Sequence, residues 1–266
     1  MTDVLGTCTA WGDGVCVVEP DGAGSREPVT IRLADIVSGK PVPPRPSPRL
    51  RVSPQQAQLR AMGLFPALET ERLGAWTLRR SRAHDARRAN SVLAMEPSGL
   101  PDETAYAGVV DFYTEHGARP IAAVLRDSEP EALFLRHGWV PESGDADTVF
   151  ELASVAAVAR TLPSADPEVE VVEDGDLVTA RIGDRASGVA ALDGDWVGYR
   201  SIVVAPEHRR QRLALAIMTA LVGWSAERGA TTAYLQVLGD NERAHALYDG
   251  LGFLEHHRYR YLAAPR

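Results

Sequence analysis

Residues 1–40 alternate apolar and polar side chains, which is the pattern of short β-strands with one buried face. Strands are predicted at 15–18 and 29–33, and glycine-rich turns interrupt the pattern before each of them. Five prolines between 41 and 48 favour a stiff, extended segment. The pattern predicts a small β module at 1–45, followed by a linker that fits a spacer better than a ligand for a partner protein.

Strand-like and helix-like patterns then alternate along the chain, which is typical of α/β and α+β folds. Strands are predicted at 75–79, 89–95, 120–125, 148–152, 169–173, 177–183, 186–192, 196–204, 232–237 and 257–262. Helices are predicted at 102–116, 130–137 and 213–228. A turn-rich stretch at 162–166 divides this region, so we expect one unit at 50–155 and another at 165–266.

An internal repeat links these two units. Ala132-Leu133-Phe134 followed by Gly138-Trp139 has the same spacing as Ala246-Leu247-Tyr248 followed by Gly252-Phe253. The first copy has a phenylalanine where the second has a tyrosine, and it lacks the arginines that precede the long helix of the second copy. The two units are therefore predicted to be copies of one fold with different chemistry.

A basic loop separates the strand that ends at Val204 from the long helix that follows it. Arg209, Arg210 and Arg212 lie in this loop, directly before the first helical turn. The unpaired N–H groups of that turn and the helix dipole attract an anion, and guanidinium groups bind phosphates through forked hydrogen bonds. The arrangement predicts a site for a pyrophosphate, with a solvated basic face as the alternative.

The overall charge of −8 argues against general binding of nucleic acid, which requires a basic face. No apolar run is long enough to cross a bilayer and no targeting segment is recognisable, so we expect a cytoplasmic protein without membrane contact. Cys8 and Cys16 are interpreted as small buried core residues. The sequence has no ligand spacing typical of a metal site, and His256, His257 and Arg258 are predicted to lie on a surface strand edge.

The residues around the basic loop resemble the GCN5-related N-acetyltransferases. That family carries Gln/Arg-x-x-Gly-x-Gly/Ala in its pyrophosphate loop, and this chain has Arg209-Arg210-Gln211-Arg212-Leu213-Ala214. The family's Asn, Tyr and Leu-Gly-Phe are matched by Asn241, Tyr248 and Leu251-Gly252-Phe253. Because glycine lets a backbone approach a ligand closely, the arginine at position 212 is a departure that bears on the affinity for coenzyme A.

More narrowly, the chain is similar to actinobacterial proteins that join an SH3-like barrel, a degenerate acetyltransferase half and a working C-terminal half. Residues 28–48 carry the resemblance to the barrel, and residues 88–94 carry that to the middle half. The resemblance implies tandem mixed sheets flanked by helices, with domains at 1–45, 50–155 and 165–266. The first half would be structural, or would form a wall of the acceptor cleft.

The resemblance also implies acetyl-CoA as acyl donor, and no metal. It assigns cofactor contacts to Ile202, Val203, Val204, Arg209, Arg210, Gln211, Arg212, Leu213, Ala214, Leu215 and Asn241. A backbone N–H between Ile202 and Val204 would bind the thioester oxygen as its charge develops, and Tyr248 would protonate the leaving sulfur. Tyr248 also fits a core position and Asn241 a helix cap. No general base is identified among the candidates Asp193, Asp195, Tyr199 and His208.

The implied function is acetyl-CoA-dependent N-acetylation of a primary amine of a small metabolite or peptide, by a monomer or homodimer. Only a few residues separate Val172 from Leu177, where the family usually has two helices that shape the acceptor pocket. We therefore expect an acceptor site that is open or is completed by the first half. The missing helices, Arg212 and the extra β module favour the alternative of a non-catalytic CoA sensor or scaffold.

Overall fold

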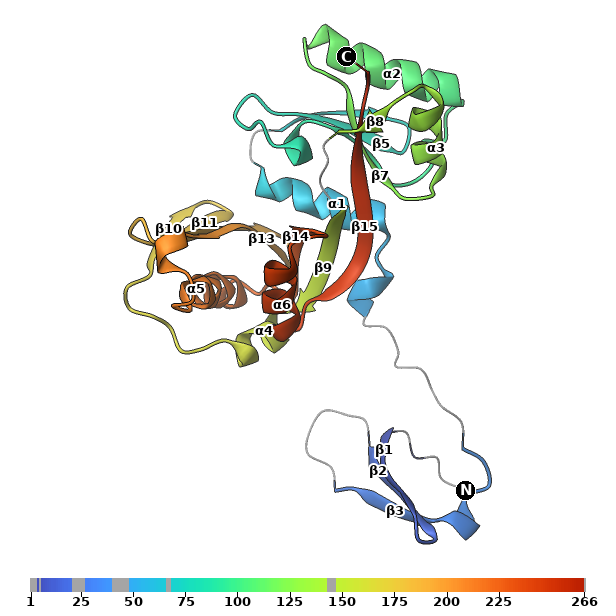
Figure 1. Ribbon diagram of the computed structural model, residues 1–266, viewed down its shortest axis with the longest axis vertical. Coiled ribbons are helices and arrows are strands. Elements are labelled where there is room, and N and C mark those ends of the chain that lie inside the picture. Colours follow the sequence, from blue (N-terminus) through green and yellow to red (C-terminus); the bar gives the residue numbers. More distant parts are fainter. Residues whose placement is uncertain are drawn as a thin grey trace. The chain divides into compact units, whose positions relative to one another are not determined.

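The computed structural model describes residues 4, 6–20, 27–39, 48–65, 68–142 and 147–265. Contacts divide the chain into two compact units, residues 1–45 and residues 46–266. The first contains a small antiparallel sheet, and the second contains one large mixed sheet flanked by helices, as predicted (Figure 1).

The first unit consists of β1 (Gly6–Gly12), β2 (Val15–Pro20) and β3 (Val29–Arg32). The two predicted strands are confirmed, and β1 is an additional one that pairs with β2. Asp13 and Gly14 join them with φ angles of 49° and 80°, as a two-residue hairpin requires. The sulfurs of Cys8 and Cys16 lie 3.6 Å apart. Cys16 is buried as predicted, whereas Cys8 is exposed, because it lies on the outer strand β1.

The second unit follows the predicted order of elements. Its helices are α1 (Pro54–Arg60), α2 (Asp102–Glu115), α3 (Glu129–Arg136), α4 (Val155–Thr161), α5 (Leu213–Glu227) and α6 (Glu242–Gly250). Its strands are β4 (Glu69–Leu73), β5 (Trp76–Arg80), β6 (Val92–Ala94), β7 (Ile121–Leu125), β8 (Val140–Pro141), β9 (Thr148–Ser154), β10 (Glu170–Asp174), β11 (Leu177–Ile182), β12 (Ala186–Asp193), β13 (Trp196–Val204), β14 (Thr232–Leu238) and β15 (Leu254–Ala263). The pattern does not predict α1, α4 or β4, and β6 is shorter than predicted because a 3₁₀ turn occupies Arg87–Ala89.

One sheet runs through the whole second unit in the order β10-β11-β12-β13-β14-β9-β15-β7-β6-β5-β4. Strand β9 precedes α5 and α6 in sequence, yet it lies between β14 and β15 and pairs antiparallel with both. Strand β15 continues beyond β9 and pairs through Tyr259–Ala263 with β7. In Figure 1, β15 accordingly reaches from the lobe of α5 and α6 to that of α2 and α3. The domain boundaries at 155 and 165 stay a prediction.

Helices α3 and α6 end in the same way. In each, the N–H that follows a glycine donates to a carbonyl five residues back, from Trp139 to Phe134 at 3.1 Å and from Phe253 to Tyr248 at 3.0 Å. The glycine has a φ of 75° in the first copy and 86° in the second, which is the left-handed conformation of a Schellman helix end. The backbone thus confirms the repeat and places Phe134 and Tyr248 at equivalent positions.

The two faces of the sheet are covered by different elements near β13. On one face α5 buries Leu213, Ile217 and Leu221 against the strands, which confirms the predicted apolar stripe. On the other face, residues of α1 and of the 3₁₀ turn Ala61–Leu64 pack against Trp196 of β13. The hairpin β10–β11 turns tightly, so the two helices that the family usually has at this point are absent from it.

The prediction that His256, His257 and Arg258 lie on the surface is wrong for His257, which is only 8% exposed, whereas Arg258 is exposed as predicted. This part of β15 pairs with β9, and pairing with β7 begins at Tyr259. The local pattern does not reveal this, because β9 comes from a distant part of the sequence.

Hydrogen bonds fix both histidines in neutral forms. Nε2 of His256 donates to the carbonyl of Val52 at 2.7 Å, so its Nδ1 accepts the Nδ1–H of His257 at 2.7 Å. The amide of Gln58 then donates to Nε2 of His257 at 3.0 Å. Burial, together with the neighbouring His256, lowers the pKa of His257 to about 3.

We predict that this histidine makes folding stability fall below about pH 6.5. Between the ordinary pKa of 6.5 and the folded value of about 3, the unfolded chain binds a proton that the folded chain does not. His257 therefore stabilises the fold fully above pH 6.5 and loses up to about 1.4 kcal/mol for each pH unit below it. Urea unfolding of the wild type and of His257→Gln from pH 4.5 to 7.5 measures the effect. Identical pH slopes in the two proteins would contradict it.

Candidate active site

Two parallel strands separate at the centre of the candidate site. β13 pairs with β14 only through Trp196–Tyr199, which lie against Thr232–Leu235. Ser201 then adopts a φ of 53°, and the register between β12 and β13 shifts opposite it. Such a bulge bends a strand and ends its pairing. The backbone of residues 200–204 is therefore unpaired on the side towards β14.

Helix α5 begins just beyond this opening with an uncapped end. Arg212 is the N-cap residue, with a left-handed φ of 60° and no side-chain hydrogen bond to the helix. The N–H groups of Leu215 and Ala216 donate to its carbonyl at 3.0 and 3.1 Å. Those of Leu213 and Ala214 have no backbone acceptor among the described residues. The positive end of the helix dipole thus presents two donors to a ligand.

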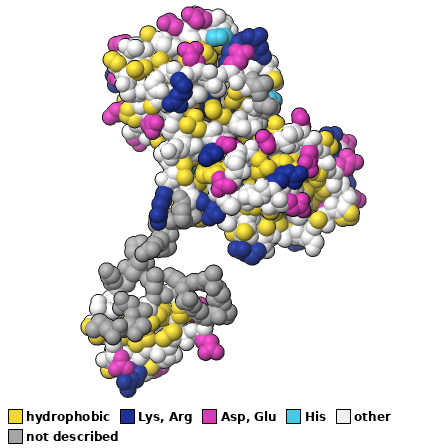
Figure 2. All heavy atoms as spheres, turned by 180° about the vertical axis from the view of Figure 1, so that it is seen from behind, with side chains coloured by type: hydrophobic (Ala, Val, Ile, Leu, Met, Phe, Trp, Pro, Cys, Tyr) yellow, Lys and Arg dark blue, Asp and Glu magenta, His cyan; other side chains and the backbone are white. Residues whose placement is uncertain are grey.

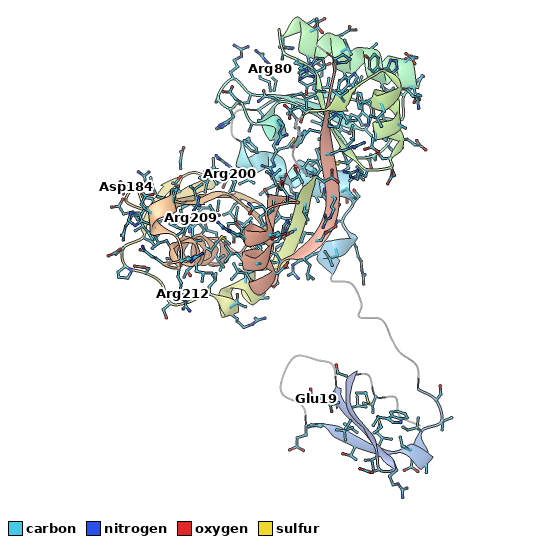
Figure 3. All side chains as sticks on the ribbon, viewed as in Figure 1. Glu19, Arg80, Asp184, Arg200, Arg209 and Arg212 are labelled. Atoms are coloured by element: carbon cyan, nitrogen blue, oxygen red, sulfur yellow. The ribbon has the colours of Figure 1, made fainter. Side chains whose placement is uncertain are left out.

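A cavity of about 460 Å³ opens at this helix end. It is lined by Val204, His208, Arg209, Arg210, Arg212, Leu213, Ala214, Leu215, Arg243 and Leu247. Four lining residues are arginines and none is acidic, so the cavity attracts anions. Figure 3 shows Arg209 and Arg212 beside α5. On the face shown in Figure 2, by contrast, basic and acidic side chains are interspersed, so the electropositive cavity is a local feature.

Most of the predicted cofactor residues line this cavity, and four do not. The side chain of Ile202 packs into the core beneath α5, while those of Val203 and Gln211 are exposed. Asn241 caps α6, because its side-chain oxygen accepts the N–H of Ala244 at 3.2 Å. Contact of these four residues with a cofactor stays a prediction.

Arg243, Leu247 and His208 line the cavity although they are not among the predicted cofactor residues. Arg243 and Leu247 are four residues apart on α6 and therefore lie on one face of that helix. The helical spacing is a signal that could have identified them, once α6 was placed beside the basic loop.

Tyr248 follows the cavity residue Leu247 and is 8% exposed. Its ring packs edge-on against Phe253, with 5.8 Å between the ring centroids. Its hydroxyl has no hydrogen-bond partner among the described residues, and the oxygen is not one of the unpartnered atoms sealed from solvent. Burial, followed by the carboxylate of Glu151, raises the pKa of Tyr248 to about 12. The phenol is therefore protonated at neutral pH.

A buried acid–histidine pair lies beside this tyrosine. Nε2 of His245 donates to the carbonyl of Leu238 at 3.1 Å. Its Nδ1 lies 2.9 Å from Oε1 of Glu151. Burial raises the pKa of Glu151, whose second oxygen is sealed from solvent without a partner among the described residues. Glu151 reaches this histidine from β9 of the first half.

The candidate general bases are spread over the domain. Asp193 and Asp195 lie at the end of β13 that is far from the bulge, and Tyr199 is buried in the core beneath α5. His208 is the one member of this set that lines the cavity.

Among the described residues, no helix is long and apolar enough to cross a membrane. In the same part of the chain, no group of three or more His, Cys, Asp or Glu side chains is placed to hold a metal ion.

The segment that builds this site matches a known family. Residues 151–262 match the family model described as "Probable histone acetyltransferase Rv0428c C-terminal". This segment of the chain, about two fifths of its length, is therefore similar to an acetyltransferase domain. The segment includes the separated strands, the cationic cavity and Tyr248.

Individual proteins are similar to this chain as well. The "Uncharacterized N-acetyltransferase YobR" of Bacillus subtilis is 36% identical over 74 residues, which is 27% of this chain and 30% of that protein. A GCN5-related N-acetyltransferase from Kribbella flavida has a TM-score of 0.59 at 17% identity, covering 81% of this chain and 96% of the other. A tandem GNAT protein from the clavulanic acid biosynthesis pathway has a TM-score of 0.52 at 13% identity, with coverages of 81% and 90%. The two structures confirm the predicted tandem fold.

We predict that Arg212→Gly is more stable than Arg212→Ala by about 1 kcal/mol. The left-handed φ of 60° strains any residue with a Cβ, and glycine removes that strain. This conformation also explains why the family prefers glycine here. Chemical denaturation of the two variants measures the difference. Equal stability would show that position 212 is not left-handed in solution.

Proposed function

We propose that the protein is an acetyl-CoA-dependent N-acetyltransferase that acetylates a primary amine of a small metabolite or peptide. The observation that carries this proposal is the cavity with four arginines at the uncapped start of α5, next to the opening between β13 and β14. Coenzyme A bears a diphosphate on a long, narrow arm. A cationic cradle beside an unpaired strand fits both features.

The diphosphate would lie at the end of α5. There the N–H groups of Leu213 and Ala214 would donate to its oxygens, and Arg209 would add forked hydrogen bonds. The arm would run along the unpaired side of β13, where its amide groups would find backbone partners. This places the thioester near Ile202, whose neighbouring N–H groups would stabilise the thioester oxygen as it gains charge.

Tyr248 would donate its hydroxyl hydrogen to the leaving sulfur. With a pKa of about 12, this phenol is a weaker acid than an ordinary thiol of pKa about 8.5. Complete transfer of the proton to a thiolate would be uphill by about 5 kcal/mol. We therefore assign Tyr248 a hydrogen bond that stabilises the thiolate.

A non-catalytic CoA sensor is the second candidate. The strained Arg212 and the tight β10–β11 hairpin, which replaces the helices that shape an acceptor pocket, favour it. Both candidates bind acetyl-CoA, so binding does not separate them. Turnover does, because a sensor releases no thiol in the presence of an amine.

We predict that Arg209→Ala and Arg243→Ala each weaken acetyl-CoA binding by about tenfold or more. Each variant removes a charged hydrogen bond to a phosphate, which contributes about 1.5–3 kcal/mol. Calorimetric titration at two salt concentrations measures the affinity, and added salt should weaken the wild type more than either variant. The control is Arg136→Ala, which removes an exposed arginine of α3 that pairs with Asp102. Saturable binding that is unchanged in both cavity variants would contradict the location of the site.

We predict that Tyr248→Phe lowers kcat by about 100-fold or more, with little change in the affinity for acetyl-CoA. The fold should tolerate this change, because the hydroxyl has no protein partner among the described residues and Phe134 occupies the equivalent place in the first half. Thiol release in a screen of amines and peptides measures the rate. An unaltered kcat would remove Tyr248 from the mechanism, and binding without any turnover would favour the sensor.

A further inference from the structure

Arg79 on β5, Arg88 in the 3₁₀ turn before β6 and Arg200 on β13 have no carboxylate partner among the described residues. Two of them belong to the first half. All three are oriented by neutral groups, so their positive charges remain uncompensated within the described part of the protein.

Arg88 lies close to the opening between β13 and β14. Its Nε donates to Oε1 of Gln236 at 2.8 Å and lies 3.4 Å from the hydroxyl of Tyr259. Gln236 directly follows Leu235, the last residue of β14 that pairs with β13. The terminal nitrogens of Arg88 have no partner among the described residues. A guanidinium whose two terminal NH2 groups are unused therefore lies beside Gln236, next to the point where the strands part.

Arg79 adds a second charge nearby. Its side chain is buried, with 3% of the residue exposed, and it donates from Nε and Nη2 to the carbonyl and hydroxyl of Ser91 at 3.0 and 2.8 Å. Burial raises the pKa of Tyr261, and the charges of Arg88 and Arg79 oppose this only in part. Tyr261 is thus close to both arginines and stays protonated, so it does not neutralise them.

Arg200 directly follows Tyr199, the last residue of β13 that pairs with β14. Its Nε donates to the carbonyl of Leu64 at 2.9 Å, and its guanidinium carbon lies 5.3 Å from the centre of the Phe65 ring. Burial lowers the pKa of Arg200, which reflects the cost of keeping this charge without an anion. In Figure 3, Arg200 lies on the side of its lobe that faces the first half, whereas Arg212 lies on the far side.

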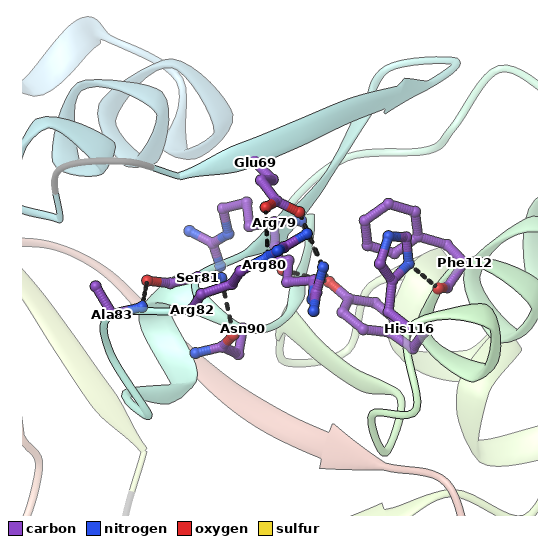
Figure 4. A network of polar contacts seen from close by, with 10 residues as sticks. Glu69, Arg79, Arg80, Ser81, Arg82, Ala83, Asn90, Phe112 and His116 are labelled. Carbon is purple, nitrogen blue, oxygen red and sulfur yellow. Dashed lines mark hydrogen bonds and ion pairs between the residues drawn. The ribbon is translucent and has the colours of Figure 1, made fainter.

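Two neighbouring arginines, by contrast, pair with a carboxylate. Arg80 and Arg82 both pair with Glu69 at 2.9 Å, as Figure 4 shows for this network. The same figure shows Asn90, which accepts the N–H of Ser81 at 3.0 Å and so holds the ends of the loop that carries Arg88. Amide hydrogen bonds order the loop, so the terminal nitrogens of Arg88 are available to bind another partner.

We propose that the acceptor amine carries an oxyanion, a carboxylate or a phosphate, which Arg88 binds with the support of Arg79 and Arg200. This inference rests on the acetyltransferase function proposed above and adds the chemical class of the acceptor. Planar guanidinium groups bind such oxyanions through paired hydrogen bonds, and a bound anion relieves the uncompensated charge. In the reaction, the amine nitrogen bonds to the acetyl carbon, the carbon–sulfur bond breaks, and the hydrogen lost by the amine is balanced by that of the released thiol. The oxyanion is unchanged.

The test compares paired acceptors with and without the oxyanion. Alanylalanine is paired with its C-terminal amide, and 2-aminoethyl phosphate is paired with ethanolamine. The wild type should show a kcat/KM about tenfold or more in favour of the anionic member of one pair. Whichever pair shows it identifies the oxyanion as carboxylate or phosphate.

Arg88→Gln should lower kcat/KM for the preferred anionic acceptor by about tenfold or more and bring the ratio within that pair close to one. Arg88→Lys, which keeps the charge without the planar fork, should restore part of the preference. The control Arg136→Gln should keep the wild-type ratio. Thermal unfolding and acetyl-CoA titration check that each variant is folded, and Arg200→Gln gives a second reading if Arg88→Gln is not.

Equal use of the charged and neutral members of both pairs, or transfer to none of the four, would overturn the inference. If acetyl-CoA still binds and neutral amines are acetylated, the proposed function stands and only the acceptor class is wrong. If acetyl-CoA does not bind at all, the proposed function itself fails.

Discussion

The short pairing between β13 and β14 is the constraint on which the candidate site depends. The two parallel strands share hydrogen bonds only as far as Tyr199 and Leu235, and the left-handed Ser201 then ends the ladder. Unpaired backbone groups inside a protein are costly unless something else satisfies them. A ligand that is rich in amides and long enough to follow a strand can satisfy the unpaired backbone groups at this opening. The cationic end of α5 lies directly beyond it.

The first half of the second unit has a structural role that does not require a phosphate site of its own. It supplies β9, which closes the sheet of the second half between β14 and β15. Through β9 it also supplies Glu151, which lies 2.9 Å from His245 beside Tyr248. Removing the first half would leave β14 as an open edge, so the second half would lose both its sheet partner and the carboxyl group near the tyrosine.

Local patterns predict those parts of the structure that local forces determine. The bounds of β13 agree with the prediction, and the spacing around Gly138 and Gly252 reveals the repeat because a glycine helix end is a short-range motif. The basic loop likewise lies beside its helix in sequence. The local pattern therefore predicts most of the residues that line the cavity.

Contacts between distant segments could not be predicted in this way. The insertion of β9 decides that β15 is a central strand, and nothing near His257 in the sequence records it. The same holds for Arg88, whose hydrogen bond to Gln236 joins residues 148 positions apart. The sequence predicts that Arg212 contacts the cofactor and departs from the glycine of the family, but it does not reveal that Arg212 is the N-cap residue of α5 with a left-handed φ of 60°.

The central claim is that backbone amides beside the strand opening and at the start of α5 bind a CoA thioester. Hydrogen exchange of individual amides, with and without acetyl-CoA, tests it most directly. The account predicts slower exchange on binding at Leu213 and Ala214 and within residues 202–204. Unchanged exchange at these amides in the presence of saturating acetyl-CoA, or slowing confined to the first half, would contradict it.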